Sequence, residues 1–113
     1  MTTTPKVLIA QQNIPNSTTT AYTSPANGKG TWVDQFDVCN YSAGAVTVRV
    51  WVVPSGGSAV DSSIRIIDKS IASKASVSLD EVVGSFMNPG DSISWSASAA
   101  TSINGGASGR EIT

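Results

Sequence analysis

The chain has 113 residues, of which 13% are charged, and its formal net charge is −1. A chain of this length forms one domain with a hydrophobic core of its own. It has no histidine and one cysteine, Cys39, which excludes histidine-based catalysis, an intrachain disulfide and a cysteine zinc site. Its seven basic residues form no cluster, so we expect no nucleic-acid partner.

The surface is expected to be poor in charge, because a soluble domain usually carries about 25–35% charged residues on its surface. Two explanations are open. Neighbouring subunits cover part of the surface, or the surface is a bland polar β surface like that of extracellular and virion proteins. The longest early apolar run, residues 7–10, is too short for a signal peptide or a membrane span. We therefore expect synthesis in a cytoplasm and no membrane partner.

Short segments of strand character alternate with turn residues along the chain. Residues 1–6 form a polar lead that contains the breaker Pro5, and we expect a flexible N-terminal arm there, followed by a single β domain over residues 7–113. Glycine-rich residues 101–107 indicate a turn. We expect strands at residues 6–12, 18–24, 31–40, 46–53, 64–72, 76–79, 92–98 and 108–113.

The segment 46–53 is the clearest strand, because valine occupies every even position. Its alternation places the valines in the core and Arg49 and Trp51 on a half-exposed outer face. The doubled Ile66-Ile67 breaks the alternation of its own strand and indicates a β-bulge. We expect core positions at Phe36, Val48, Val50, Ile93 and Trp95.

Regular turn spacing identifies the fold class. About eight short strands, separated by turns every ten or so residues, indicate an all-β antiparallel β-sandwich of the jelly-roll or Ig-like kind. Residues 78–81 match the capping box S-x-x-E, which allows at most one helical turn.

Candidate chemistry is sparse. Asp34 and Asp37 lie three apart on one expected strand, so they should point to opposite faces rather than form a catalytic pair. We expect no catalytic residue, no cofactor and no metal, and we interpret Cys39 as a small buried hydrophobe. Five aromatic residues either form a sugar-stacking platform or, as we favour, anchor the core and interfaces: Tyr22, Trp32, Tyr41, Trp51 and Trp95.

Five segments spread over residues 7–112 follow one another in a familiar order and spacing. They are Ala21-Tyr-Thr-Ser-Pro-Ala26, then Val38-Cys-Asn40 with Ala45-Val-Thr-Val48, then Val52-Val-Pro-Ser-Gly-Gly57, then Asn88-Pro-Gly-Asp-Ser-Ile-Ser94, and finally Ser108-Gly-Arg-Glu-Ile112. Together they resemble a family of small β-sandwich virion structural proteins of tailed bacteriophages, with its "VPSGG" loop, "PGDxI" turn and terminal "SGxEI" strand.

The resemblance implies a non-enzymatic subunit of the virion. It implies a capsid decoration (cement) protein that binds the major capsid protein and stabilises the head, in homo-oligomeric form. A neck, tail or fibre-adaptor subunit is the alternative within this class. A carbohydrate-binding β-sandwich module, with a glycan as partner, is the alternative from another class. The family offers no catalytic residues to carry over.

Interfaces between permanent partners are poor in charge and anchored by aromatic and aliphatic residues. Three parts of the chain fit this description: the N-terminal segment, the loop 25–30 and the outer face of the valine strand. We expect mainly apolar and backbone contacts there, which depend weakly on salt. The candidate interface residues are Thr2, Thr3, Lys6, Lys29, Arg49 and Trp51.

Overall fold

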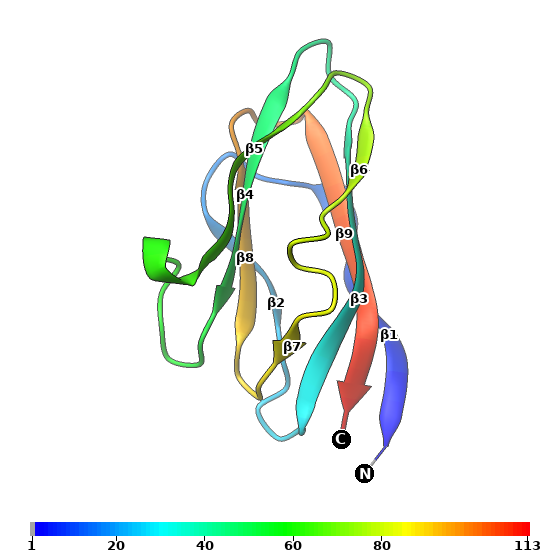
Figure 1. Ribbon diagram of the computed structural model, residues 1–113, viewed down its shortest axis with the longest axis vertical. Coiled ribbons are helices and arrows are strands. Elements are labelled where there is room, and N and C mark those ends of the chain that lie inside the picture. Colours follow the sequence, from blue (N-terminus) through cyan, green and yellow to red (C-terminus); the bar gives the residue numbers. More distant parts are fainter. Residues whose placement is uncertain (1) are drawn as a thin grey trace.

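A computed structural model describes residues 2–113, and nearly all of its regular structure is antiparallel β-strand. Two sheets face each other and bury one hydrophobic cluster between them (Figure 1). The predicted all-β antiparallel sandwich is confirmed. The strands are β1 Thr3–Asn13, β2 Thr19–Thr23, β3 Gly30–Asn40, β4 Val46–Val53, β5 Ile64–Ile71, β6 Ser76–Ser78, β7 Phe86–Met87, β8 Ser92–Ala97 and β9 Ile103–Ile112.

Each sheet brings together strands that are distant in the sequence. In the first, which we call sheet A, the strand order is β1-β9-β3-β6, and β7 also pairs with β3. In the second, sheet B, the order is β2-β8-β4-β5. Strand β9 is therefore internal to sheet A, whereas β1 forms an edge whose outer side pairs with no other strand of residues 2–113.

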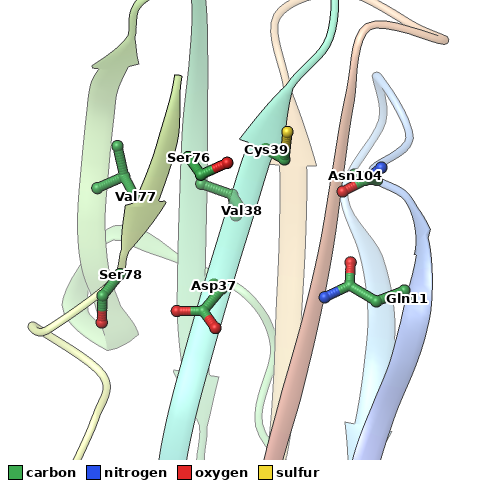
Figure 2. Close-up of a pocket in the computed structure, with 8 residues that line it drawn as sticks. All are labelled: Gln11, Asp37, Val38, Cys39, Ser76, Val77, Ser78 and Asn104. Atoms are coloured by element: carbon green, nitrogen blue, oxygen red, sulfur yellow. The ribbon is translucent and has the colours of Figure 1, made fainter. Parts of the chain in front are cut away.

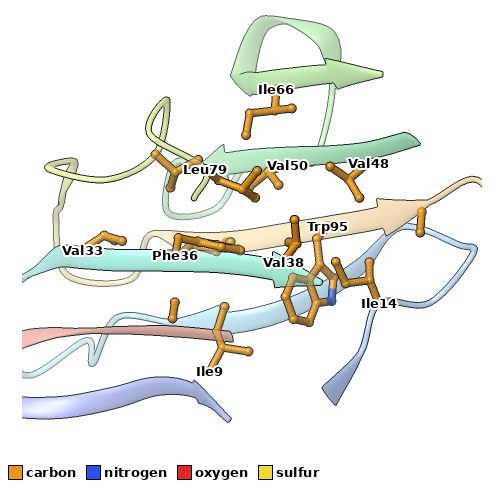
Figure 3. Packing of buried hydrophobic residues seen from close by; sticks show 14 of the residues in the cluster. Ile9, Ile14, Val33, Phe36, Val38, Val48, Val50, Ile66, Leu79 and Trp95 are labelled. Atoms are coloured by element: carbon orange, nitrogen blue, oxygen red, sulfur yellow. The ribbon is translucent and has the colours of Figure 1, made fainter. Parts of the chain in front are cut away.

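The core lies between the sheets, where the alternation of the strands predicted it (Figure 3). Phe36 from sheet A and Trp95 from sheet B meet edge to face, with ring centroids 6.0 Å apart, an arrangement that the quadrupoles of aromatic rings favour. The predicted core positions Phe36, Val48, Val50, Ile93 and Trp95 are each at most 2% exposed, so this prediction is confirmed.

The expected flexible arm over residues 1–6 is not what the described residues show. Thr3 to Lys6 belong to β1 and pair in regular register with the end of β9, with Thr3 opposite Ile112 and Lys6 opposite Gly109. Pro5 is tolerated because β1 is an edge strand, where a missing N–H breaks no second ladder. Met1 lies outside the described residues.

The glycine-rich segment expected as a turn is a strand. Residues 103–112 form β9, which pairs with β1 on one side and β3 on the other. A Cβ on Gly105 would lie 3.1 Å from the ring of Trp95 and 3.2 Å from side chains of Ile14 and Val38. Gly105 is therefore a packing requirement of the core, which the sequence alone presents as a turn signal.

The one helical turn of the described chain lies elsewhere than expected. A 3-10 helix, η1, spans Asp61–Ser63 in the loop between β4 and β5. Residues 80–84, just after β6, form a turn instead of a helix, and the backbone N–H groups of Val82 and Val83 donate to the carbonyl oxygen of Leu79 at 3.0 and 3.3 Å. The bulge predicted at Ile66-Ile67 is confirmed. The register slips there against β4, and Asp68 adopts a φ of 47°.

Candidate functional site

A groove runs along the outer face of sheet A, on the side away from the core (Figure 2). We call it the outer groove. Its larger part has a volume of about 620 Å³, and a smaller part of about 230 Å³ continues past Gln11 and Asp37 toward Val7 and Ser108. The larger part is lined by Gln11, Asp37, Val38, Cys39, Ser76, Val77, Ser78 and Asn104.

Gln11 lies over the internal strand β9 because that strand carries no side chain at Gly106. A Cβ there would lie 2.8 Å from Nε2 of Gln11 and 3.1 Å from the carbonyl oxygen of Ile9. The amide of Gln11 therefore occupies the space above the backbone that a β9 side chain would fill. Glycine inside a strand often marks such a close approach of another group.

The polar side chains of the outer groove are mostly free to bind. Asp37 accepts a hydrogen bond of 2.6 Å from Gln35 Nε2, which leaves further acceptor capacity on its carboxylate. Within residues 2–113, the side-chain amides of Gln11 and Asn104 make no hydrogen bond. Cys39 is half-buried and lines the groove, so its interpretation as a buried hydrophobe is wrong.

A bulge changes the predicted directions of two aspartates. The register of β3 against β9 shifts between Val33 and Gln35, so Asp34 is an extra residue of β3 with no partner on β9. Both carboxylates consequently lie on the outer side of sheet A, contrary to our expectation. They do different things: Asp34 forms a bidentate ion pair with Arg110, 2.9 Å for each hydrogen bond, and Asp37 lines the groove.

Four of the predicted interface residues lie together at the end of the sandwich where both chain termini lie (Figure 1). The backbones of Thr2 and Thr113 exchange two hydrogen bonds of 2.9 and 2.8 Å. The backbone N–H of Lys29 donates to the carbonyl oxygen of Ile112 at 2.7 Å. These contacts gather the exposed residues Thr2, Thr3, Lys6 and Lys29 around the end of β9.

Lys6 also belongs to a partly buried polar network that joins the two sheets. Its ammonium group lies 3.2 Å from a carboxylate oxygen of Glu111, which is 8% exposed. The other oxygen of Glu111 accepts a hydrogen bond from the hydroxyl of Tyr22, on β2 of sheet B. Tyr22 is also 3.1 Å from the hydroxyl of Thr31, which is in turn 2.7 Å from that of Ser24.

The network fixes the protonation states of its two central groups. The hydrogen bond from Tyr22 is the largest cause that holds the pKa of Glu111 below its usual range, and Lys6 acts in the same direction. Burial, followed by the hydrogen bond to Glu111, raises the pKa of Tyr22 to about 12. The carboxylate is therefore ionised and already satisfied by its two partners, which suits a link between sheets.

We expect Tyr22→Phe to lower the free energy of unfolding by about 1–3 kcal/mol, because it leaves a mostly buried carboxylate without one donor. Since the folded pKa of Glu111 is lowered, its stabilisation is present above the unfolded pKa of about 4.3. It is lost as the pH falls through the folded value. Urea denaturation from pH 7 down to pH 3 measures both effects.

The matched control for this variant is Tyr41→Phe, which removes an exposed hydrogen bond of 2.6 Å to Asn13. We expect this control to be nearly neutral and insensitive to acid. Equal losses for the two variants, or a loss for Tyr22→Phe that stays constant down to pH 3, would contradict the role given to the network.

Arg49 and Trp51 lie on the outer face of sheet B, far from the patch around Lys6 in the fold. Arg49 forms a bidentate ion pair with Asp68, with hydrogen bonds of 2.6 and 3.0 Å. Trp51 is only 5% exposed, so the predicted half-exposed position is wrong. The loop 54–63, with η1, stands on this outer side of β4 (Figure 1).

The indole N–H of Trp51 is buried and has no hydrogen-bond partner. A buried donor without an acceptor costs about 1–3 kcal/mol. The hydrogen bonds of residues 56–63 all run within the loop 54–64 itself. An interface role for Trp51 stays a prediction, and it requires this loop to move.

The aromatic side chains do not form one platform. Trp95 is in the core and Trp51 lies beside the loop 54–63, on opposite faces of sheet B. Trp32, on the outer side of sheet A, packs against Phe86 with ring centroids 4.9 Å apart, and the guanidinium of Arg110 lies 6.0 Å from its ring. The three tryptophans therefore lie in three different surroundings.

Three further findings complete the description of the site. Residues 2–113 contain no group of three or more His, Cys, Asp or Glu side chains that could hold a metal ion. No helix in the described part of the chain is long and apolar enough to cross a membrane.

Comparisons with protein-family models, curated proteins and solved structures found no match to this chain. The fold and the site together define a small antiparallel β-sandwich with a polar groove on one sheet.

Proposed function

We propose that this chain is a non-enzymatic structural subunit of a tailed-phage particle, and specifically a decoration (cement) protein that binds the major capsid protein. The proposal rests on the resemblance of the five segments quoted above. The structural observation that supports it best is the free edge of β1, an 11-residue strand at the margin of sheet A. A free strand edge is a template for pairing with another chain, and here Pro5 leaves the donors of Thr3 and Val7 on the free side of residues 3–7.

The regular part of this edge is short and accessible. Thr3 to Val7 pair without interruption with β9, and the register shifts beyond Val7. The side chain of Val7 is 64% exposed, so a partner strand would find an apolar contact beside the backbone hydrogen bonds. Each such contact is modest, and many copies on one lattice add up to stable binding.

About half of the charged side chains are paired within the chain, four of the seven basic and four of the eight acidic ones. Four ion pairs join Lys6 to Glu111, Arg49 to Asp68, Lys69 to Glu81 and Arg110 to Asp34. Paired charges contribute little attraction to a distant partner. This supports a contact that is apolar and made through the backbone, with only weak dependence on salt.

A neck, tail or fibre-adaptor subunit would use the same edge, and the two placements differ in copy number. Mass spectrometry of purified particles measures it. Hundreds of copies per particle indicate the head shell or the tail tube. Roughly a dozen copies or fewer, the number in a ring of symmetric subunits, indicate the neck, baseplate or fibre. Absence from particles contradicts the proposal.

A binding experiment tests the contact itself. Protein is added back to stripped particles over a salt series, as wild type and as Val7→Lys. We expect salt to change the binding of wild type little and Val7→Lys to weaken it at least about tenfold, because the variant places an ammonium in an apolar contact. Release of wild type by moderate salt, with normal binding of Val7→Lys, would contradict an apolar contact at this edge.

The matched control is Ile67→Lys. Ile67 is also β-branched, also 64% exposed and also on an edge strand, but that strand belongs to sheet B. We expect the control to bind like wild type, which separates loss of a specific contact from a general effect of added charge.

A further inference from the structure

We propose that the outer groove is a binding site for a neutral, hydroxyl-rich oligosaccharide that lies along β9. The proposal goes beyond a structural role in a particle and does not depend on it. It rests on the shape of the groove, on the hydrogen-bonding capacity of its side chains and on the absence of cationic side chains among its lining residues.

The shape favours an extended ligand. The two parts of the groove share Gln11 and Asp37 and run from Asn104 to Ser108 along β9, a length of about 14 Å at the rise of a β-strand. The larger part, about 620 Å³, falls within the usual range of small-molecule sites, about 300–1,000 Å³. A chain of several sugar units fits such a trough better than a single ring.

The side chains offer what sugar hydroxyls need. A hydroxyl donates one hydrogen bond and accepts others, and side-chain amides do both. The amides of Gln11 and Asn104 are unpartnered, and the carboxylate of Asp37 is a pure acceptor with one protein donor. Gln11 and Asp37 flank β9 from opposite sides (Figure 2), so neighbouring hydroxyls on one ligand would meet an amide and a carboxylate together.

The glycine at the centre of the groove makes this arrangement possible. Because β9 has no side chain at Gly106, Gln11 reaches over the strand and presents its amide in the groove. At the smaller end, the exposed side chain of Val7 provides methyl groups for the C–H faces of a sugar ring. The combination of apolar contact with a few polar groups is typical of ligand sites.

The charge of the groove selects against anions. Asp37 is the only charged side chain among the residues that line its two parts, and none of those residues is a lysine or arginine. A phosphate, sulfate or carboxylate on the ligand would meet a like charge without a compensating cation. The ligand class is therefore a neutral glycan.

The test starts with an array of neutral, sialylated and sulfated glycans probed with the full chain. The best neutral oligosaccharide is then titrated by NMR. We expect shifts of the side-chain amides of Gln11 and Asn104 and of the β9 backbone. A bound glycan should also slow the reaction of the half-buried Cys39 with a thiol reagent, because that side chain lines the same groove.

Two variants locate the site. Gln11→Ala and Asp37→Ala should each weaken binding at least about tenfold, since each removes a hydrogen-bonding group that the ligand has desolvated. Their matched controls are Gln12→Ala, whose amide donates to Ala10 instead, and Asp61→Asn, an exposed aspartate in η1. Thermal unfolding of all four variants should match wild type, because every altered side chain is at the surface.

The proposal is overturned by any of four results. These are no binding of neutral oligosaccharides at millimolar concentration, binding confined to anionic glycans, binding of a neutral glycan that both groove variants leave unchanged, and shifts confined to sheet B. Particle association lost by Val7→Lys but kept by Gln11→Ala would show that the edge contact and the groove are separate functions.

Discussion

Trp95→Ala should lower the free energy of unfolding by about 3–5 kcal/mol, the usual cost of truncating a buried aromatic residue. Trp95 is 2% exposed and lies between the sheets, where its ring meets Phe36 edge to face. Because a domain of this size has about 5–15 kcal/mol of stability in total, we expect little or no soluble protein. Soluble yield and urea denaturation measure the effect.

Ile67→Ala is the control for this loss, because Ile67 is 64% exposed and its truncation leaves no cavity. We expect a change within about 0.5 kcal/mol for the control. A Trp95→Ala protein that is soluble and within 1 kcal/mol of wild type would show, on that order-of-magnitude scale, that the two sheets do not share the core described above.

Among substitutions of glycine by alanine in this chain, we expect Gly109→Ala to cause the largest loss of stability. A Cβ at this position would lie only 1.9 Å from the carbonyl oxygen of Trp32 and 2.9 Å from Cδ1 of Leu8. The Leu8 side chain can move, but the oxygen belongs to β3, which pairs with β9 at this position. We expect a loss of about 3 kcal/mol or more, at the upper end of overpacking effects, measured by urea denaturation.

Gly44→Ala supplies the comparison at a glycine where no atom lies within 4 Å of the added Cβ. There the change should be within about 1 kcal/mol and tend toward stabilisation, because alanine reduces the freedom of the unfolded chain. Similar stabilities of the two variants would contradict the close approach of β3 and β9 at Gly109.

Most of the sandwich could be predicted because its strands carry their own signal. Alternation within Val46–Val53 identified both the strand and its buried face, and the doubled Ile66-Ile67 identified the bulge. The failures have a common physical cause. Gly105, Gly106 and the residues near Pro5 carry turn or breaker chemistry locally, but their conformations are decided by pairing with strands far away in the sequence.

The candidate site was less predictable for the same reason. Gln11, Asp37 and Asn104 come from three strands, and no spacing within any one of them indicates a groove. Tyr22 and Glu111 are 89 positions apart. The one available signal was the pair of glycines at 105 and 106 between strand-like residues, because glycine in an internal strand marks a position where another group comes close.

The reciprocal hydrogen bonds between Thr2 and Thr113 make the backbone almost a closed ring. A short linker between these two residues would turn β9 and β1 into an ordinary hairpin, since they already pair as antiparallel neighbours. New ends opened in the loop 54–63 would break no hydrogen bond to the sheets from residues 56–63. In such a circular permutant the pairing of β1 with β9 becomes local, whereas the pairing of β4 with β5 becomes the most distant one. The permutant therefore exchanges one long-range pairing for another, and its folding rate would show which of the two hairpins matters more for folding.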